Sequence, residues 1–565
     1  MSLFGSIQLA NNALRANQVG LQVVGQNIAN ANTPGYIREE VNFQSAPTQR
    51  VGNLLLGLGV NVDGVVQKVD QFLEERLRGA TSDAVSSDTQ KQTFEQLEGL
   101  IAELGSTDLS TSLGNFFSSI NEVLNQPESS SVRNLALLKG QTLAGDINRL
   151  AKRVGDLRSD VNDRVNNIAN EINRLTENIR ALNVRITEIE GGETSGSDAV
   201  GLRDQRQVAL TNLSKLIDIR VQEQASGSVT VQAGGDFIVF EGEAREIVVD
   251  PSSDRGLTVG KLVFEDSSAV LQAGSGELAG VMTSRDKILG TFLDSLDGFA
   301  RTLAFEFNKV YSSGQGLNGY HELTSEFAVS DATAALDAAG LSFTPVNGSF
   351  EIQVFNRKTG VTQRTQITVD LNGLDHDTSL TDLVSQLGAI NGVSASIGPR
   401  GNLNIQSDSQ DQEVAFGNDT SGLLAALGVN TFFSGTTASS LGVNQTVIDD
   451  PSKFAISKNG IGEDTANGVE LAAFLDRALE TQNGTTISGL YERLTADTTQ
   501  ASTVARSVAE GFKSFEESLR GQSLAISGVN IDEEAVKMLA FQRAFQASAK
   551  YIATLNELLG ILVSL

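Results

Sequence analysis

Several residue types that commonly carry chemistry are absent or rare in this chain of 565 residues. It has no cysteine, which excludes disulfides, thiol catalysis and cysteine-ligated metal sites. It has no tryptophan, two histidines and seven prolines. It has no run of about 20 apolar residues, so no transmembrane helix is expected, and its first residues lack the basic and apolar regions of a secretory signal. At this length several domains are expected.

The net charge of −27 is distributed unevenly along the chain. Residues 1–80 hold six basic and six acidic side chains, and residues 520–565 hold four of each, so the negative charge lies in the middle. An acidic body argues against binding nucleic acid, whose phosphates require basic patches. It also argues against an anionic membrane surface. We therefore expect no nucleic-acid partner and no membrane insertion.

No catalytic, cofactor-binding or metal-binding motif is found in the sequence. His321 and His376 are far apart and match no metal-ligating spacing. Residues 370–381 superficially resemble a calcium loop, but Gly373 stands at position 4 and Thr381 replaces the final Glu. No phosphate-binding glycine loop and no nucleophile elbow is present. The sequence therefore predicts no enzyme, no cofactor and no metal site.

Both ends of the chain carry the apolar spacing of helices that pack against other helices. The predicted N-terminal seam consists of Ile7, Leu14, Leu21, Val24 and Ile28. The predicted C-terminal seam consists of Met538, Phe541, Phe545, Ile552, Leu555, Leu559 and Leu562. Chain ends are usually polar and frayed, so these apolar ends are expected to be buried.

Two kinds of burial are compatible with these seams. The two helices could form an intramolecular coiled coil, or they could assemble with many copies of similar helices. Neutral amides such as Gln8, Asn11 and Gln18 flank the first seam, where a surface helix usually has Lys and Glu. Neutral flanks can be packed on several sides without burying charge, which favours assembly. The acidic pair Glu533 and Glu534 is interpreted as first-turn residues at the positive end of the last helix.

The pattern between the ends predicts long helices and small β domains. The first helix, about 2–31, is expected to end before a type II turn at Pro34 and Gly35. Apolar positions at alternating steps of 3 and 4 predict a helix over 147–189, roughly 65 Å long. Gly and Ser at 191–197 separate it from a return helix, with which it forms an antiparallel pair. Further helices are expected at 68–104, 109–125, 198–218, 280–311 and from about 469 onward.

Strand-like alternation predicts three β regions: short strands at 51–66, a small antiparallel domain at 219–264, and a ββαββ module within 328–430. The fold class is therefore multidomain α+β, with a helical coiled-coil rod from both ends and inserted antiparallel β domains. We expect four domains. They are a terminal coiled-coil domain (1–50 and 521–565), a helical rod domain (51–218, 284–320 and 445–520), a β domain (219–283) and an inserted β-rich domain (321–444).

The segment 27–41 resembles the N-terminal signature of the axial proteins of the bacterial flagellum, the rod, hook and hook-associated proteins. Its specific part is Ala31, Asn32, Thr33, Pro34, Gly35 and Tyr36. Residues 527–565 are similar to the matching C-terminus. Residues 218–242 and 427–444 resemble the hook-associated protein found at the hook–filament junction, and 350–407 resemble insert modules of flagellins.

The resemblance implies an extracellular structural protein at the hook–filament junction. It implies export by the flagellar type III apparatus and polymerisation through the terminal helices. Implied partners are other copies in a ring, the hook protein, hook-associated protein 3, and a FlgN-like export chaperone at the C-terminal helix. Three alternatives stay open: a hook or rod protein, a secreted adhesin, and an enzyme within the insert.

Overall fold

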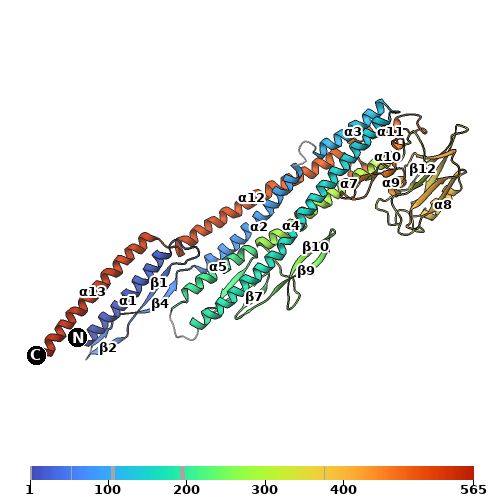
Figure 1. Cartoon of the computed structure of the whole chain (residues 1–565). Coiled ribbons are helices and arrows are strands. Elements are labelled where there is room, and N and C mark those ends of the chain that lie inside the picture. Colours follow the sequence, from blue (N-terminus) through green and yellow to red (C-terminus); the bar gives the residue numbers. More distant parts are fainter. Residues whose placement is uncertain (1–2, 52–53, 103–107, 191–196, 375, 565) are drawn as a thin grey trace. The chain divides into compact units, whose positions relative to one another are not determined.

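The computed structural model describes residues 3–51, 54–102, 108–190, 197–374 and 376–564. Its contacts divide the chain into two compact units. Unit 1 comprises Met1–Thr93, Ser159–Asp286 and Thr503–Leu565, and unit 2 comprises Phe94–Arg158 and Lys287–Ser502. Long helices and small antiparallel sheets make up both units, which confirms the predicted α+β class (Figure 1). The division into four domains stays a prediction.

Most helices match their predicted ranges, but the long helix predicted over 147–189 begins earlier, at Ser130. Unit 1 contains α1 (Leu3–Asn30), α5 (Val200–Leu216), α6 (Gly276–Thr283) and α13 (Ile531–Ser564). Unit 2 contains α3 (Leu109–Asn125), α7 (Gly290–Tyr311), α8 (Leu380–Gly388), α9 (Leu423–Leu427), α10 (Gln445–Asp449) and α11 (Ala466–Ala472). Residues of both units belong to α2 (Gln71–Ala102), α4 (Ser130–Glu190) and α12 (Ile487–Ser527). Most of the predicted break after the long helix, 191–196, lies outside the described residues.

The strands form small antiparallel sheets. In unit 1 they are β1 (Glu39–Ser45), β2 (Thr48–Val51), β3 (Leu54–Gly57), β4 (Val60–Gln67), β5 (Arg220–Glu223), β6 (Val229–Ala233), β7 (Asp236–Phe240), β8 (Glu243–Ala244), β9 (Ile247–Asp254) and β10 (Leu257–Phe264). In unit 2 they are β11 (Glu322–Thr324), β12 (Gly348–Asn356), β13 (Val361–Val369), β14 (Val393–Ile397), β15 (Leu403–Ser407), β16 (Gln412–Gly417), β17 (Phe433–Ser434) and β18 (Gly442–Val443).

The larger sheets have the strand orders β5-β6-β7-β8, β13-β12-β16 and β11-β15-β14. The remaining strands form sheets of two strands each. The predicted ββαββ module is present as β12, β13, α8, β14 and β15. Its sheets have two strands more than predicted, because β16 returns to pair with β12 over Glu351–Asn356 and β11 pairs with β15 over Glu322–Thr324.

Three asparagines of α4 hold the β strands of unit 1 against this helix. Asn162, Asn173 and Asn183 each donate Nδ2–H to a strand carbonyl and accept a strand amide at Oδ1. The donated bonds reach the carbonyls of Thr258, Ile247 and Val229, at 3.2, 2.8 and 2.7 Å. Each pair of bonds satisfies strand groups that would otherwise be buried without a partner. The predicted apolar stripe of α4 is buried beside them, at Ile168, Ile172, Leu175, Ile179, Leu182 and Ile186.

Unit 2 has two cores. An aromatic cluster joins α3, α7 and the residues around β17, and its members are Phe116, Phe117, Phe307, Tyr311, Phe432, Phe433, Phe454 and Phe474. The rings pack mainly tilted or edge to face, the favoured arrangements of aromatic pairs. The inserted module has its own apolar core between its two sheets and α8, with Ile352, Leu383 and Phe416 fully buried.

Candidate assembly interface

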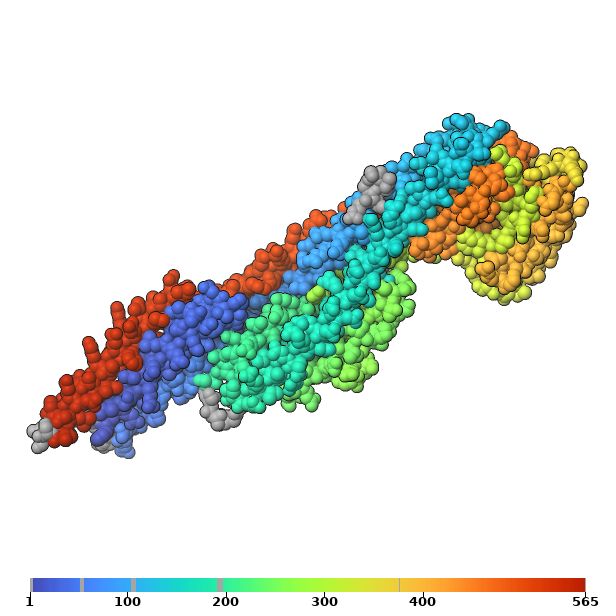
Figure 2. Space-filling view, viewed as in Figure 1, coloured from blue at the N-terminus to red at the C-terminus, as the bar shows by residue number. Residues whose placement is uncertain are grey.

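The first and last helices of the chain lie side by side within unit 1. Figure 2 shows α13 (red) running along α1 (blue). Gly20 allows the close approach, since a Cβ at this position would lie 2.7 Å from the Phe541 ring. The same ring packs against Phe43 of β1, with centroids 6.2 Å apart. The chain ends are therefore paired with one another in the single chain.

The seam residues of α1 lie at the margin of this pairing. Val24 is buried, whereas Ile7, Leu14, Leu21 and Ile28 are only partly buried. Most buried positions of α1 are instead small or polar: Ser6, Ala10, Ala16, Gly20 and Asn27 accompany Val23 and Val24. Small side chains let the neighbouring elements approach the helix closely, so the larger seam residues are left with one side uncovered.

The seam residues of α13 divide in the same way. Leu555 is buried, and Met538, Phe541, Phe545, Ile552 and Leu559 are partly buried. Leu562 is 60% exposed. The single chain thus brings most of the predicted seam together without covering it completely.

A second apolar stripe on α13 was not predicted from the sequence. Its members are Val536, Leu539, Tyr551, Leu558 and Ile561, all at least 41% exposed. Phe4 at the start of α1 is exposed as well. Val536 and Leu539 are three residues apart, Tyr551 and Leu558 seven, and Leu558 and Ile561 three. This helical spacing was the signal in the sequence that could have revealed a second apolar face. Exposed apolar stripes of this length mark surfaces that bind other proteins.

A polar cluster, buried except for Glu533, ties the start of α13 to the segment after α1. Arg38 donates two hydrogen bonds to Glu534 Oε1, at 3.0 and 2.7 Å, and one to Glu533 Oε2 at 3.1 Å. Asn27 donates Nδ2–H to Glu534 Oε2 at 3.0 Å and to the Glu39 carbonyl at 2.9 Å. We call this cluster of Asn27, Arg38, Glu533 and Glu534 the clasp. Glu534 is completely buried within it.

The clasp keeps its charges ionised despite burial. Burial by itself would raise the pKa of the Glu534 carboxyl. Hydrogen bonds from Asn27 and Arg38 and the positive charges of Lys537 and Arg38 outweigh this effect, so the pKa of Glu534 is lowered. Sequence reasoning placed Glu534 in the first turn of the last helix, which is confirmed. It missed the partner Arg38, because nothing in the sequence relates two residues so far apart.

The family signature forms the predicted turn. The Tyr36 amide donates to the Thr33 carbonyl at 3.2 Å, and Gly35 has a φ of +79°, as a type II turn requires at this position. A side chain at Gly35 would also meet Val208, since a Cβ would lie 2.3 Å from its Cγ2. Asn32, Thr33, Pro34 and Gly35 are exposed, and Ala31 is partly buried. Tyr36 donates its hydroxyl to Asn27 Oδ1 at 2.8 Å, which connects the signature to the clasp.

The carboxyls of Glu39 and Asp204, beside the signature, are buried or half-buried without enough hydrogen bonds or positive charges to favour their ionised forms. Burial raises the pKa of Glu39, whose Oε2 has no hydrogen-bond partner. Burial, with a contribution from Glu39, raises the pKa of Asp204 to about 6, although the Ile37 amide and Gln67 donate to it. Burial also raises the pKa of Tyr36. The pKa values on this side of the signature are therefore raised, whereas the pKa of Glu534 in the clasp is lowered.

The two histidines have one or two polar partners each. His376 lies 3.0 Å from Asp382 and is exposed, and His321 Nδ1 lies 3.0 Å from the Gln412 carbonyl. Among the described residues, no group of three or more His, Asp or Glu side chains could hold a metal ion. None of the described helices combines the length and the hydrophobicity that a bilayer span requires.

Three family models match separate parts of the chain. Residues 94–326 match the flagellar hook-associated protein FlgK helical domain. Residues 7–36 match the flagella basal body rod protein, and residues 520–565 match the flagellar basal body rod FlgEFG protein C-terminal model. Of these three models, the one that matches the middle describes a hook-associated protein, and the two that match the ends describe rod proteins.

Full-length relatives decide the family. Flagellar hook-associated protein 1 of Salmonella typhimurium is 23% identical over 589 residues, covering 99% of each chain. The protein of the same name from Escherichia coli is 24% identical over 573 residues, again covering 99% of each. The chain belongs to the flagellar hook-associated protein 1 family. It is therefore a structural protein of the bacterial flagellum.

Other members of the hook-associated protein 1 family share less of the chain or only the fold. The Bacillus subtilis member is 26% identical over 353 residues, covering 56% of this chain and 69% of its own. The solved structure of the flagellar hook junction protein FlgK from Burkholderia pseudomallei covers 80% of this chain and 100% of its own, with a TM-score of 0.51 and 15% identity. This similarity supports the fold described above.

Proposed function

We propose that this chain is the non-enzymatic structural protein that joins the hook to the filament of the bacterial flagellum, outside the cell. The observation that supports this role most is the uncovered apolar surface of the paired ends. The relatives that span the whole chain are hook-associated proteins 1, and the Burkholderia structure is described as a hook junction protein. The matching of 94–326 to a hook-associated model separates this role from that of a rod protein, whose similarity is confined to the ends.

Polymerisation through α1 and α13 follows from their exposed side chains. Val536, Leu558 and Ile561 face water in the single chain. Burying one such side chain completely is worth about 1.5–3 kcal/mol. Several of them, covered together by neighbouring copies, offset the entropy lost when a chain is immobilised. The predicted seam residues, Ile7 to Ile28 and Met538 to Leu562, lie along the margin of the same surface.

The same surface suits the proposed partners. In a ring, other copies of this chain cover the stripe on α13, and the hook protein and hook-associated protein 3 meet the ring on its two sides. Before assembly, a FlgN-like export chaperone covers the C-terminal helix, because an amphipathic helix with exposed apolar residues is the usual ligand of a groove. Passage through the flagellar type III export apparatus requires the clasp to be open, since it joins residues 496 positions apart.

Immunogold labelling of isolated flagella tests the junction role. An antibody raised against residues 328–430 should label a narrow band where hook meets filament. Label along the whole hook, or at the rod, would retain the flagellar assignment and contradict the junction role. Label absent from the flagellum would contradict both and would favour an adhesin.

A further inference from the structure

A pocket of about 650 Å³ lies within unit 1, between the start of α2, α5 and the strands β5 and β6. Its lining includes Ile37, Phe72, Arg78, Leu210 and Val221. It is separate from the clasp and from the apolar stripe of α13. Nothing in the proposed function makes use of this pocket.

Arg78 is the unusual residue of the pocket. It is only 7% exposed, and its Nε has no hydrogen-bond partner. Within the described part of the chain it forms no ion pair either. Burial lowers the pKa of Arg78 despite the nearby negative charges of Glu74 and Glu75. An arginine buried without a partner costs stability, so a group that pairs with it has an energetic advantage.

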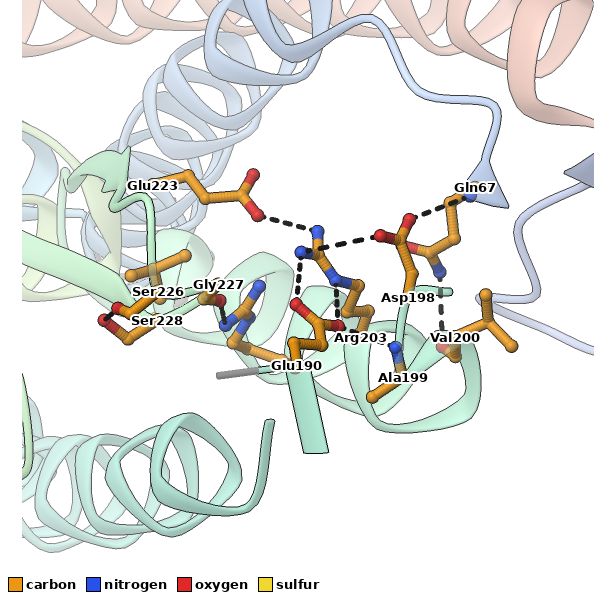
Figure 3. A network of polar contacts seen from close by, with 12 residues as sticks. Gln67, Glu190, Asp198, Ala199, Val200, Arg203, Glu223, Ser226, Gly227 and Ser228 are labelled. Carbon is orange, nitrogen blue, oxygen red and sulfur yellow. Dashed lines mark hydrogen bonds and ion pairs between the residues drawn. The ribbon is translucent and has the colours of Figure 1, made fainter. Parts of the chain in front are cut away.

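The other two arginines of the pocket already have polar partners, although only Arg203 is paired with carboxylates. Arg203 forms ion pairs with Glu190 and Glu223, each at 2.7 Å, and lies 3.9 Å from Asp198 (Figure 3). Arg206 donates to Asn183 Oδ1 at 3.1 Å and to the Gly227 carbonyl at 2.7 Å. Of these three arginines, Arg78 is the one for which the described residues provide neither an ion pair nor a partner for its buried Nε, whereas Arg206 forms no ion pair but donates to two neutral oxygens.

The nearby carboxylates of α2 do not neutralise Arg78. Glu74 accepts hydrogen bonds from Gln207 Nε2, at 2.6 Å, and from the Ser523 hydroxyl. Glu75 is exposed. Both lie one turn before Arg78 on the same helix. The unpaired guanidinium therefore lies at a pocket wall whose other charged groups are exposed or satisfied elsewhere.

We propose that this pocket is a binding site for a carboxylate group that pairs with Arg78. A guanidinium and a carboxylate match in their planar, two-point geometry. One unpaired positive charge calls for a single negative charge, and Glu74, Glu75, Asp198 and Glu223 in the lining would repel a dianion such as phosphate. Apolar lining residues, including the 70% exposed Phe72, suit a carboxylate carried on a short aliphatic chain.

Two sources carry this chemistry. One is a small aliphatic carboxylate in solution. The other is an Asp or Glu side chain of a neighbouring copy, which this acidic chain supplies in abundance. The second source rests on the proposed function, because it requires the chain to assemble, whereas the first does not.

Butyrate titration of the isolated chain tests the site. Binding is followed on the Nε–H signal of Arg78 in arginine-labelled protein and by calorimetry, with chloride at equal ionic strength as the reference. The Arg78 signal should move downfield on butyrate addition, and Arg78→Met should weaken binding at least tenfold. Arg76→Met removes an exposed charge two residues away and should change binding less than twofold. An unmoved Arg78 signal in the wild-type chain, which requires no variant to fold, overturns the proposal. Equal binding by the two variants overturns it as well.

Comparison of the isolated and assembled chain separates the sources. If a neighbour supplies the carboxylate, butyrate binds the isolated chain only, and Arg78→Met reduces incorporation into flagella about tenfold. If the ligand is a small molecule, butyrate binds both forms equally, and Arg78→Met incorporates like the wild type. Failure of the wild-type chain to incorporate would contradict the proposed function and leave the result on the isolated chain unchanged.

Discussion

In the inserted β module, Ile352, Leu383 and Phe416 are 0% exposed, while on α13 Val536, Leu558 and Ile561 are 68, 49 and 58% exposed. The module closes its core with residues from its two sheets and from the helices α8 and α9. The paired ends cover only one face of α13 and leave the other in water. A domain that buries its apolar residues within itself needs no partner to be stable. An element that leaves an apolar face in water is expected to bind another chain through that face.

The greatest effect is expected where a charge enters the buried side of the ends. Leu555→Asp places a carboxylate at a position that is 5% exposed. The lost apolar contact alone costs about 2–5 kcal/mol, and the unpaired charge adds to it. Incorporation into flagella should be abolished and hydrogen exchange of α13 should accelerate, while exchange in the β module stays unchanged. Phe545→Asp should act in the same way.

A control on the exposed stripe sharpens this result. Leu558→Asp should leave the exchange of α13 in the isolated chain as it is and still abolish incorporation. If Leu555→Asp and Leu558→Asp both incorporate almost like the wild type, α1 and α13 need no further contacts beyond their own pairing. The contrast between the ends and the β module would then be wrong.

The clasp comes next in expected effect. Arg38→Met leaves Glu534 buried without its main cation, and breaking a buried pair in this way costs about 3–5 kcal/mol. The start of α13 should lose hydrogen-exchange protection. Because the pKa of Glu534 is lowered in the folded chain, its contribution is complete above the ordinary carboxyl pKa and is lost as the pH falls below it. The difference between wild type and Arg38→Met should accordingly shrink on acidification; a constant difference would show that packing, and not charge, holds the clasp.

Asp204 should respond to pH in the opposite direction. Its pKa of about 6 in the folded chain lies above the ordinary value of 3.8, so the folded chain binds more protons between these limits. Stability from this group therefore falls as the pH rises from about 4 to 6. Asp204→Asn removes that loss, worth about 1 kcal/mol after allowance for solvent screening of a half-exposed carboxyl. Chemical unfolding at pH 5 and pH 7 measures this change in the free energy of unfolding. Glu39→Gln is the matched control, because it removes a neighbouring carboxyl whose pKa is also raised.

The smallest effect is expected from removing the module altogether. The Glu326 amide donates to the Gly428 carbonyl at 3.3 Å, so a short glycine linker can replace 328–427. Because the module has its own core, its removal should leave the exchange of α1 and α13 unchanged and incorporation within about twofold. Loss of incorporation in a shortened chain whose ends remain paired would assign the module a part in assembly.

Local patterns in the sequence were sufficient for most of the long helices and strands, but not for residues 130–146 of α4 or for the short helices α9 and α10. The alternating steps of 3 and 4 in α4, the Pro34–Gly35 turn and the strands of the module all depend on residues near one another. Partners distant in the chain were not predictable. Asn162, Asn173 and Asn183 read as polar positions of a helix, and only the fold shows that they bind strand backbone. The same holds for Arg38 with Glu534 and for the unpaired Arg78, because charge pairing depends on distances in space.

The clasp also has a place in time. A ribosome, or an export channel that releases its cargo in order, delivers Asn27 and Arg38 hundreds of residues before Glu533 and Glu534. A chain that stops short of α13 leaves Arg38 without its carboxylates, and Asn27 loses its hydrogen bond to Glu534. The clasp can therefore close only after the chain has been synthesised or exported as far as α13. In a chain truncated before α13, no other side chain of the clasp neutralises the charge of Arg38.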